Sequence, residues 1–209
     1  ETGKEVSIHL FGQELQPETY AICKADMLLK GDGKQAEHIS YGSTLSMDGN
    51  ATRQFDFMLS NPPYGKSWKV DAEKMGGKKD ILDSRFNACL EDGTQLAMIP
   101  RVSDGQLLFL LNNVAKMKTD TPLGSRIAEV HNGSSLFTGD AGSGESNARR
   151  YLIESDLVEA VIALPEKMFY NTGIGTYIWV LSNRKEARRQ GNFQLIDATG
   201  IKTPLRKNM

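Results

Sequence analysis

The sequence predicts an α/β fold in which a mostly parallel, twisted sheet is flanked by helices. Short apolar segments alternate along the chain with longer segments of helical periodicity, a pattern typical of βαβ units. The 209 residues include 39% hydrophobic side chains and show no internal repeat or heptad run. This hydrophobic content suits a packed core. Because a domain usually has roughly 100–200 residues, the length favours a single domain.

In the first half of the chain, apolar runs predict three strands and helical periodicity predicts one helix. Val6–Phe11 is an apolar strand, and Pro17–Leu29 follows as a helix with proline near its first turn, where proline is favoured. Ile39–Tyr41 is a short strand that ends at a glycine-serine turn. Phe55–Leu59 is an apolar strand that ends at an Asn-Pro-Pro sequence. Residues 64–85 are polar and rich in lysine and glycine, which predicts a mobile surface loop.

The second half of the chain continues the alternation of strands and helices. Thr94–Ile99 is predicted as a strand, and the leucine-rich segment Leu107–Lys118 is predicted as a helix. A glycine-rich loop over residues 136–146 precedes a predicted helix at Asn147–Glu154. The remaining predicted strands are Arg126–Val130, Val158–Leu164, Thr176–Leu181 and Phe193–Ile196.

Composition narrows the classes of protein that the sequence can represent. Lysine and arginine total 25 and aspartate and glutamate total 26, so the net charge is −1. The chain as a whole is not strongly basic, so its net charge gives no argument for nucleic-acid binding. A near-neutral net charge does not exclude local basic patches. No apolar run approaches the roughly 20 residues that span a bilayer, and two cysteines argue against a disulfide framework. We therefore expect a cytoplasmic protein without a membrane partner, and the dispersed histidines predict no metal site.

The segment Ser60-Asn61-Pro62-Pro63-Tyr64-Gly65 carries the clearest chemical pattern. It follows an apolar strand, and ligands of parallel sheets bind beyond the carboxyl ends of the strands. The two prolines stiffen the peptide and remove two backbone donors. The Asn61 side-chain carbonyl and the Pro62 backbone carbonyl could accept both protons of a planar amino group, and Tyr64 offers a face for stacking. The alternative is an ordinary turn that ends a strand.

The tetrapeptide Asn61-Pro62-Pro63-Tyr64 resembles the signature of S-adenosylmethionine-dependent amino methyltransferases. Longer stretches resemble one subfamily, the modification (methylase) subunit of type I restriction-modification systems, and they cover nearly the whole chain. The resemblance implies a Rossmann-like methyltransferase fold that methylates the exocyclic N6 amino group of a flipped adenine in DNA. The matching stretches are Gly12–Leu15, Thr19–Met27, Phe55–Gly65, Pro100–Leu111, Asn132–Arg150 and Ala163–Asn183.

The resemblance also implies roles for single residues of the catalytic motif. Asn61 and Pro62 would accept from the amino group of the target adenine, Pro63 would keep the turn rigid, and Tyr64 would stack on the base. Phe169 follows a predicted strand at the position where the family places a wall against the flipped base. Ordinary core packing is the alternative for Phe169.

For the cofactor S-adenosylmethionine, the resemblance implies two contacts near the N-terminus. Glu14 would hold the ribose hydroxyls, because a carboxylate accepts well from two adjacent hydroxyls. The alternative is that Glu14 only stabilises the following helix, because an acidic side chain near a helix N-terminus interacts favourably with the helix dipole. Ser43 occupies the position that usually contacts the cofactor adenine, although an ordinary turn serine is equally consistent with the sequence.

The sequence lacks a counterpart of the family's glycine-rich cofactor loop and of its N-terminal helical region. It therefore resembles one partial catalytic domain, 1–209, truncated at both ends, with residues 1–54 from the cofactor half and 55–209 forming the catalytic half. We expect the isolated chain to be inactive and unable to bind S-adenosylmethionine. The partners that the resemblance implies are DNA, a specificity subunit and a restriction (motor-nuclease) subunit.

Two other functions stay open from the sequence. A glutamine side-chain amide also presents a planar amino group, and enzymes that methylate protein glutamine share the tetrapeptide. The matching stretches after Pro100 argue against that substrate. The second alternative is that this chain alone serves as an assembly module without catalysis.

Overall fold

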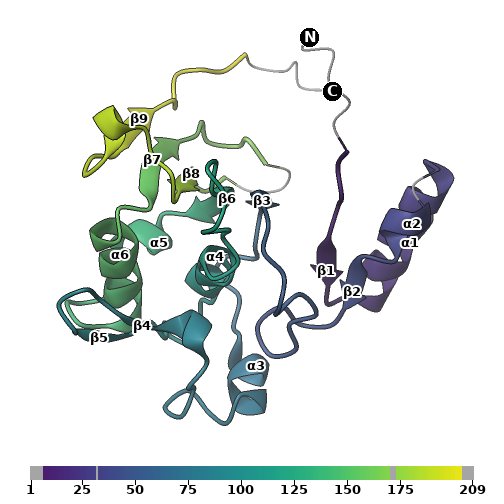
Figure 1. Ribbon diagram of the computed structural model, residues 1–209, viewed down its shortest axis with the longest axis horizontal. Coiled ribbons are helices and arrows are strands. Elements are labelled where there is room, and N and C mark those ends of the chain that lie inside the picture. The colour runs from purple at the N-terminus through teal and green to yellow at the C-terminus, as the bar shows by residue number, and fades with distance from the viewer. Residues whose placement is uncertain (1–6, 32, 170–172, 204–209) are drawn as a thin grey trace. The chain divides into compact units, whose positions relative to one another are not determined.

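The computed structural model describes residues 7–31, 33–169 and 173–203 (Figure 1). The chain forms two compact units, residues 1–53 and residues 54–209, here called the N-terminal and C-terminal units. The assignment of these units as cofactor and catalytic halves stays a prediction. Within the described residues, no helix is both long and apolar enough to cross a membrane.

The N-terminal unit is built on two short parallel strands joined by helices. Strand β1, Gly12–Glu14, pairs in parallel with β2, Ile39–Tyr41, so that Glu14 lies opposite Tyr41. Helix α1, Pro17–Leu29, and the short helix α2, Gly33–Ala36, connect them (Figure 1). The bounds predicted for α1 and β2 are confirmed to the residue, because both elements carry local signals at their ends.

The strand predicted at Val6–Phe11 is wrong. Val6 lies outside the described residues, residues 7–11 are not in a strand, and β1 begins only at Gly12. The physical reason is that β2 has three residues, so it supplies ladder partners to Gly12–Glu14 alone. The preceding segment is held by side chains instead: the Leu10 N–H donates to Gln35 at 2.6 Å, and Phe11 stacks on His38 with ring centroids 4.3 Å apart.

The C-terminal unit contains a five-stranded sheet with the order β3-β6-β8-β7-β9. Strand β6 is parallel to β3, β9 is parallel to β7, and β8 is antiparallel to both of its neighbours, β6 and β7. Four strands therefore run in one direction and their carboxyl ends lie at one edge, which confirms the mostly parallel sheet. The strands are β3 Phe57–Ser60, β6 Arg126–Asn132, β7 Val158–Ala163, β8 Thr176–Ser182 and β9 Gln194–Asp197.

Helix α4, Gln106–Val114, contacts β6 of this sheet, and helix α6, Gly144–Glu154, contacts α4 (Figure 1). Helix α4 is buried along most of its length, and a buried leucine side chain stabilises the fold by roughly 1.5–3 kcal/mol. Ser143 caps the N-terminus of α6, and its hydroxyl accepts from the Ser146 N–H at 3.3 Å. The core between helices and sheet includes Leu108, Leu111, Ile127, Leu152 and Leu181.

Two predicted segments form structure that differs from the prediction. Within Thr94–Ile99, strand β5, Gln95–Ala97, pairs antiparallel with β4, Asn87–Cys89, in a hairpin outside the main sheet, because an Asp-Gly turn reverses the chain. The predicted loop 64–85 contains helix α3, Lys69–Lys74, and begins the 3₁₀ helix Ser84–Phe86. Buried apolar side chains anchor this segment despite its polar composition. Short helices also occur at Ser134–Phe137 (α5) and Ala187–Arg189.

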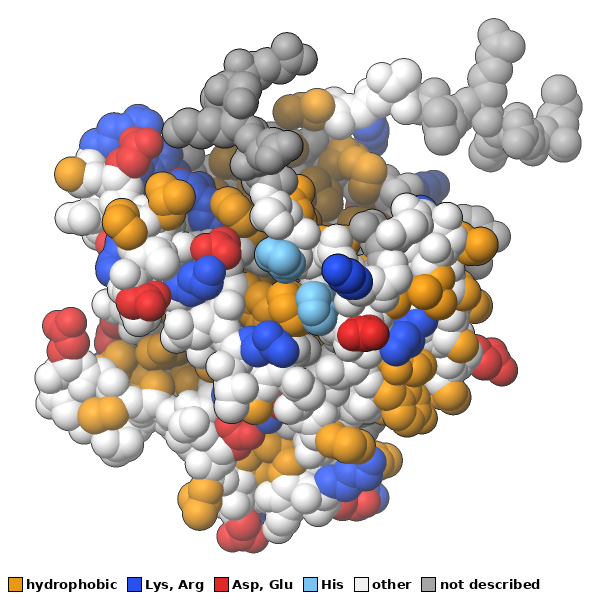
Figure 2. Space-filling view, turned by 45° about the vertical axis from the view of Figure 1, so that its right-hand side comes forward, with side chains coloured by type: hydrophobic (Ala, Val, Ile, Leu, Met, Phe, Trp, Pro, Cys, Tyr) orange, Lys and Arg blue, Asp and Glu red, His pale blue; other side chains and the backbone are white. Residues whose placement is uncertain are grey.

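Strand β3 lies at the end of the described sheet and pairs there with β6. Its side chains alternate: Met58 is buried, whereas Phe57 and Leu59 are 74% and 84% exposed. Exposed hydrophobic side chains also occur in several places on the face of the molecule shown in Figure 2. The strand that leads into the Asn-Pro-Pro-Tyr motif therefore has one buried face and one open apolar face.

Candidate active site

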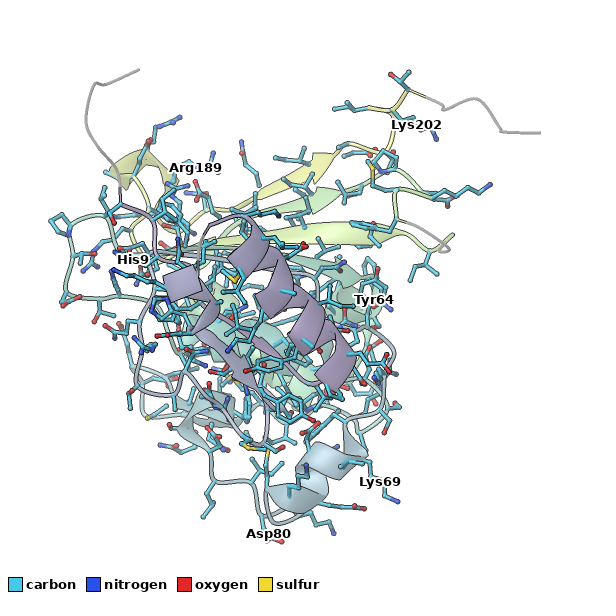
Figure 3. All side chains as sticks on the ribbon, turned by 90° about the vertical axis from the view of Figure 1, so that its right-hand side faces the viewer. His9, Tyr64, Lys69, Asp80, Arg189 and Lys202 are labelled. Atoms are coloured by element: carbon cyan, nitrogen blue, oxygen red, sulfur yellow. The ribbon has the colours of Figure 1, made fainter. Side chains whose placement is uncertain are left out.

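The motif lies at the edge where the parallel strands of the C-terminal unit end. Asn61 follows β3 directly, Gly133 follows β6, and Leu164 follows β7. In Figure 3, Tyr64 lies on the side where the chain continues beyond β9 to Lys202. Arg189, which precedes β9, lies on the opposite side. This is the edge at which ligands bind in open α/β sheets.

The motif presents its acceptor side chain outward. Asn61 is exposed, and its side chain makes no hydrogen bond to any residue that the structure describes. Pro62 is buried, Pro63 is exposed and Tyr64 is half-buried. Pro62 therefore packs against the rest of the protein, while the Asn61 amide stays accessible to a ligand.

A buried carboxylate holds the N-terminal end of the motif. Ser60 is paired in register with Glu129 of β6, and the Ser60 hydroxyl donates to Glu129 Oε2 at 2.5 Å. Asn113 Nδ2 of α4 donates to the same oxygen at 2.7 Å. Glu129 Oε1 lies 2.7 Å from His131 Nε2, and both of these side chains are fully buried.

A second carboxylate holds the C-terminal end of the motif. The Gly65 N–H donates to Asp104 Oδ1 at 3.2 Å, and the Ser134 hydroxyl donates to Asp104 Oδ2 at 2.6 Å. Gln106 Nε2 also donates to Asp104 Oδ2, at 2.7 Å, and to Asn132 Oδ1 at 2.8 Å. Asp104 and Gln106 are buried. The network ties the motif to the end of β6 and to the start of α4.

The residues after the motif pack closely on the segment 101–105. Trp68 is buried, and its indole N–H donates to the Arg101 carbonyl at 3.0 Å. Its backbone N–H donates to the Val102 carbonyl at 3.0 Å. A Cβ at Gly105 would lie 2.9 Å from the Trp68 ring, so glycine allows this close approach. The turn is thus fixed on both sides, which limits its freedom to reorient.

Phe169 follows β7 at the same edge of the sheet and is half-buried. Strand β7 stands three positions from β3 in the sheet, about 14 Å away at the usual spacing of strands. Residues 170–172, which follow Phe169, lie outside the described residues. The role of Phe169 as a wall against a target base stays a prediction.

The residues predicted to bind the cofactor lie at the carboxyl ends of neighbouring strands in the N-terminal unit. Glu14 ends β1, and its Oε1 accepts from the Gln16 N–H at 2.8 Å, which leaves Oε2 for a ligand. A carboxylate oxygen at a strand end fits the ribose hydroxyls of S-adenosylmethionine. Ser43 is buried, and its hydroxyl accepts from the Leu45 N–H at 3.2 Å. That hydrogen bond stabilises the turn after β2. Contact of Ser43 with the cofactor adenine stays a prediction.

Sequence reasoning missed the residues that hold the motif. Glu129 stands inside the predicted strand Arg126–Val130, and a charged residue within an apolar strand could have indicated a buried polar contact. Asp104 lies in a segment without such a signal. Its bond to Gly65 joins residues 39 positions apart, and only the fold reveals this contact.

Known proteins share this fold. The type I restriction-modification system methyltransferase subunit from Streptococcus thermophilus is 28% identical, with a TM-score of 0.69 over 91% of this chain and 36% of that chain. A Listeria monocytogenes protein assigned to the class I S-adenosylmethionine-dependent methyltransferases shares the fold at 16% identity. Its TM-score is 0.57, over 95% of this chain and 52% of that chain.

A sequence relative comes from Methanocaldococcus jannaschii. It is the type I restriction enzyme MjaVII methylase subunit, 28% identical over 195 residues. The match covers 92% of this chain, which spans 30% of the length of that relative.

These similarities identify the chain in two steps. Its α/β architecture, with one reversed strand in a mostly parallel sheet, is the fold of S-adenosylmethionine-dependent methyltransferases. The model of the N-6 DNA methylase family matches residues 1–208, and the chain belongs to this family. The expected fold is therefore confirmed, and S-adenosylmethionine is the cofactor that the fold implies.

Proposed function

We propose that this chain is part of a DNA adenine methyltransferase, which transfers a methyl group from S-adenosylmethionine to the N6 amino group of a flipped adenine. The observation that carries the proposal is the exposed Asn61 amide, which bonds to no described residue and lies in a turn fixed at both ends by buried carboxylates. An acceptor held in place before the substrate arrives can stabilise developing charge without reorganising.

Each residue of the motif has a defined task in this proposal. The adenine amino group is a poor nucleophile because its lone pair is delocalised into the ring. The Asn61 side-chain carbonyl and the Pro62 carbonyl accept its two N–H groups and orient the lone pair toward the methyl group. Tyr64 stacks on the extruded base, which must leave the duplex to reach the site. Bound S-adenosylmethionine would supply the activated methyl group, and Glu14 would hold its ribose.

The proposed setting is a type I restriction-modification complex in the cytoplasm. The relatives named above are methylase or methyltransferase subunits of such systems. We propose that the full-length protein works with DNA, a specificity subunit and a restriction subunit. These relatives favour DNA over protein glutamine as the substrate, and the near-neutral net charge suits a subunit that leaves sequence reading to a partner.

Methyl transfer from labelled S-adenosylmethionine tests this proposal. The full-length protein, assembled with its partner subunits, is offered duplex DNA or a glutamine-containing peptide. We expect label in DNA, recovered after digestion to nucleosides as N6-methyl-2′-deoxyadenosine. Label in the peptide alone, or in another base, would contradict the proposal.

Replacing Glu14 by glutamine is expected to weaken S-adenosylmethionine binding by roughly ten- to hundredfold in the full-length protein. A hydrogen bond to a charged group contributes about 1.5–3 kcal/mol, and the substitution removes that charge. Glutamine keeps an oxygen for the Gln16 N–H, so the local turn survives. Calorimetric titration measures the affinity, with the exposed residue Glu18 replaced by glutamine as the matched control. Equal affinities for both variants would reject Glu14 as a ribose ligand.

Replacing Tyr64 by alanine is expected to weaken retention of the flipped base by roughly 1–3 kcal/mol, because base–aromatic stacking contributes that much. The fluorescence of a base analogue at the target position reports flipping in the assembled enzyme. Tyr64→Phe keeps the ring and should behave like the wild type. Unchanged flipping in the alanine variant would count against a stacking role.

A further inference from the structure

Glu129 is an unusual residue for the centre of a sheet. Its carboxylate is fully buried, and in the described part of the chain it forms no ion pair with lysine or arginine. Burying a charge without a cation costs free energy, and a well-packed apolar side chain would avoid that cost. Stability alone therefore does not account for a carboxylate at this position.

Three neutral donors surround this carboxylate. Ser60 Oγ and Asn113 Nδ2 donate to Oε2 at 2.5 and 2.7 Å. His131 Nε2 lies 2.7 Å from Oε1, while His131 Nδ1 is buried and has no hydrogen-bond partner among the residues that the structure describes. A proton on Nδ1 would be a buried donor without an acceptor, so we assign the neutral ring with its proton on Nε2. The ring then donates to Glu129 Oε1, so the carboxylate oxygens accept from all three groups.

The Ser60 hydroxyl is consequently fixed in direction. It donates to Glu129 and also accepts from Asn113 Nδ2 at 3.3 Å. Ser60 is the last residue of β3, and Asn61 follows it directly. Because Pro62 and Pro63 restrict the backbone beyond Asn61 and Asp104 holds Gly65, the orientation of Asn61 depends on how Ser60 is held.

We propose that Glu129 is a positioning residue for methyl transfer. Through the Ser60 hydroxyl it sets the direction of the peptide that carries Asn61, and so the direction in which the Asn61 carbonyl meets the target amino group. The inference rests on the proposed function of the motif. Small errors in the placement of a reacting group can lower a rate by about a hundredfold without changing which groups are present.

Two substitutions of Ser60 test this inference in the full-length, assembled enzyme. Ser60→Ala removes the hydroxyl that links Glu129 to the motif, and Ser60→Thr keeps it. We expect Ser60→Ala to lower the single-turnover rate of adenine methylation by roughly ten- to hundredfold, with S-adenosylmethionine and DNA affinities unchanged. Ser60→Thr should recover most of the rate. A role in folding alone would lower thermal stability without this separation of rate from affinity.

Combining Ser60→Ala with Glu129→Gln adds a second readout. If both residues act through one link, the double variant is about as slow as the slower single variant. A wild-type rate for Ser60→Ala, equally slow alanine and threonine variants, or fully multiplicative effects in the double variant would each overturn the inference. Absence of adenine methylation by the wild type would instead contradict the proposed function. If Glu129→Gln does not fold, the Ser60 pair decides the question alone.

Discussion

Replacing Asn61 by alanine in the full-length, assembled enzyme is expected to reduce methylation by a hundredfold or more while DNA binding stays nearly unchanged. Loss of one preorganised acceptor costs on the order of a hundred- to a thousandfold in rate. The Asn61 side chain is exposed and bonds to no described residue, so its removal leaves the packing of the turn intact. The rate of methyl transfer and the dissociation constant for DNA are measured on the same preparation.

A matched control for this variant is Asn192→Ala. Asn192 is also exposed, and it lies in the loop that precedes β9. Its side chain donates to the Gln190 carbonyl at 3.0 Å, a local contact whose loss should leave methylation unchanged. If Asn61→Ala methylates DNA at the rate of this control, Asn61 is not the acceptor for the target amino group.

Replacing Gly144 by alanine is expected to destabilise the full-length protein by about 1–3 kcal/mol or more, because overpacking a well-packed site has this cost. A Cβ at Gly144 would lie 1.8 Å from the Ile99 carbonyl oxygen and 2.2 Å from its carbon, so backbone must move. The first turn of α6 is also bonded to this segment: the Arg101 N–H donates to Glu145 Oε1 at 2.9 Å. Any displacement of α6 therefore disturbs several bonds together.

Denaturant unfolding of the full-length protein measures this effect. Gly200→Ala is the control, since an added Cβ there meets no atom within 4 Å and the glycine does not adopt a positive φ. The two variants make the same chemical change, so their difference isolates the close approach of α6 to Ile99. Equal midpoints for both variants would show that α6 and the Ile99 backbone can separate at little cost.

Local signals predict the bounds of some elements more closely than those of others. Pro17 at the start of α1 and Gly42 after β2 mark the ends of those elements, and their predicted bounds are confirmed. The reversed direction of β8 has no local signal, because it follows from pairing with β6 and β7. The strand predicted at Val6–Phe11 failed because an apolar run forms a strand only where a partner is present.

In the candidate active site, too, the local features could be predicted from the sequence and the long-range contacts could not. The Asn-Pro-Pro-Tyr motif is contiguous in the sequence, and its rigidity and its acceptors follow from residue types alone. The carboxylates that hold it are distant in the chain: Glu129 is 69 positions from Ser60, and Asp104 is 39 positions from Gly65. Such contacts depend on the order of the strands and on the helix that packs against them. They could not be predicted from one sequence.

The position of β3 at the end of the described sheet has a measurable consequence for hydrogen exchange. Every second amide of an edge strand points away from its neighbour, and such amides exchange with solvent unless another strand covers them. Amides bonded to β6 exchange only when the sheet opens locally or globally. Exchange rates along Phe57–Ser60 would therefore report, residue by residue, whether the strand that leads into the acceptor turn is held on one side or on both.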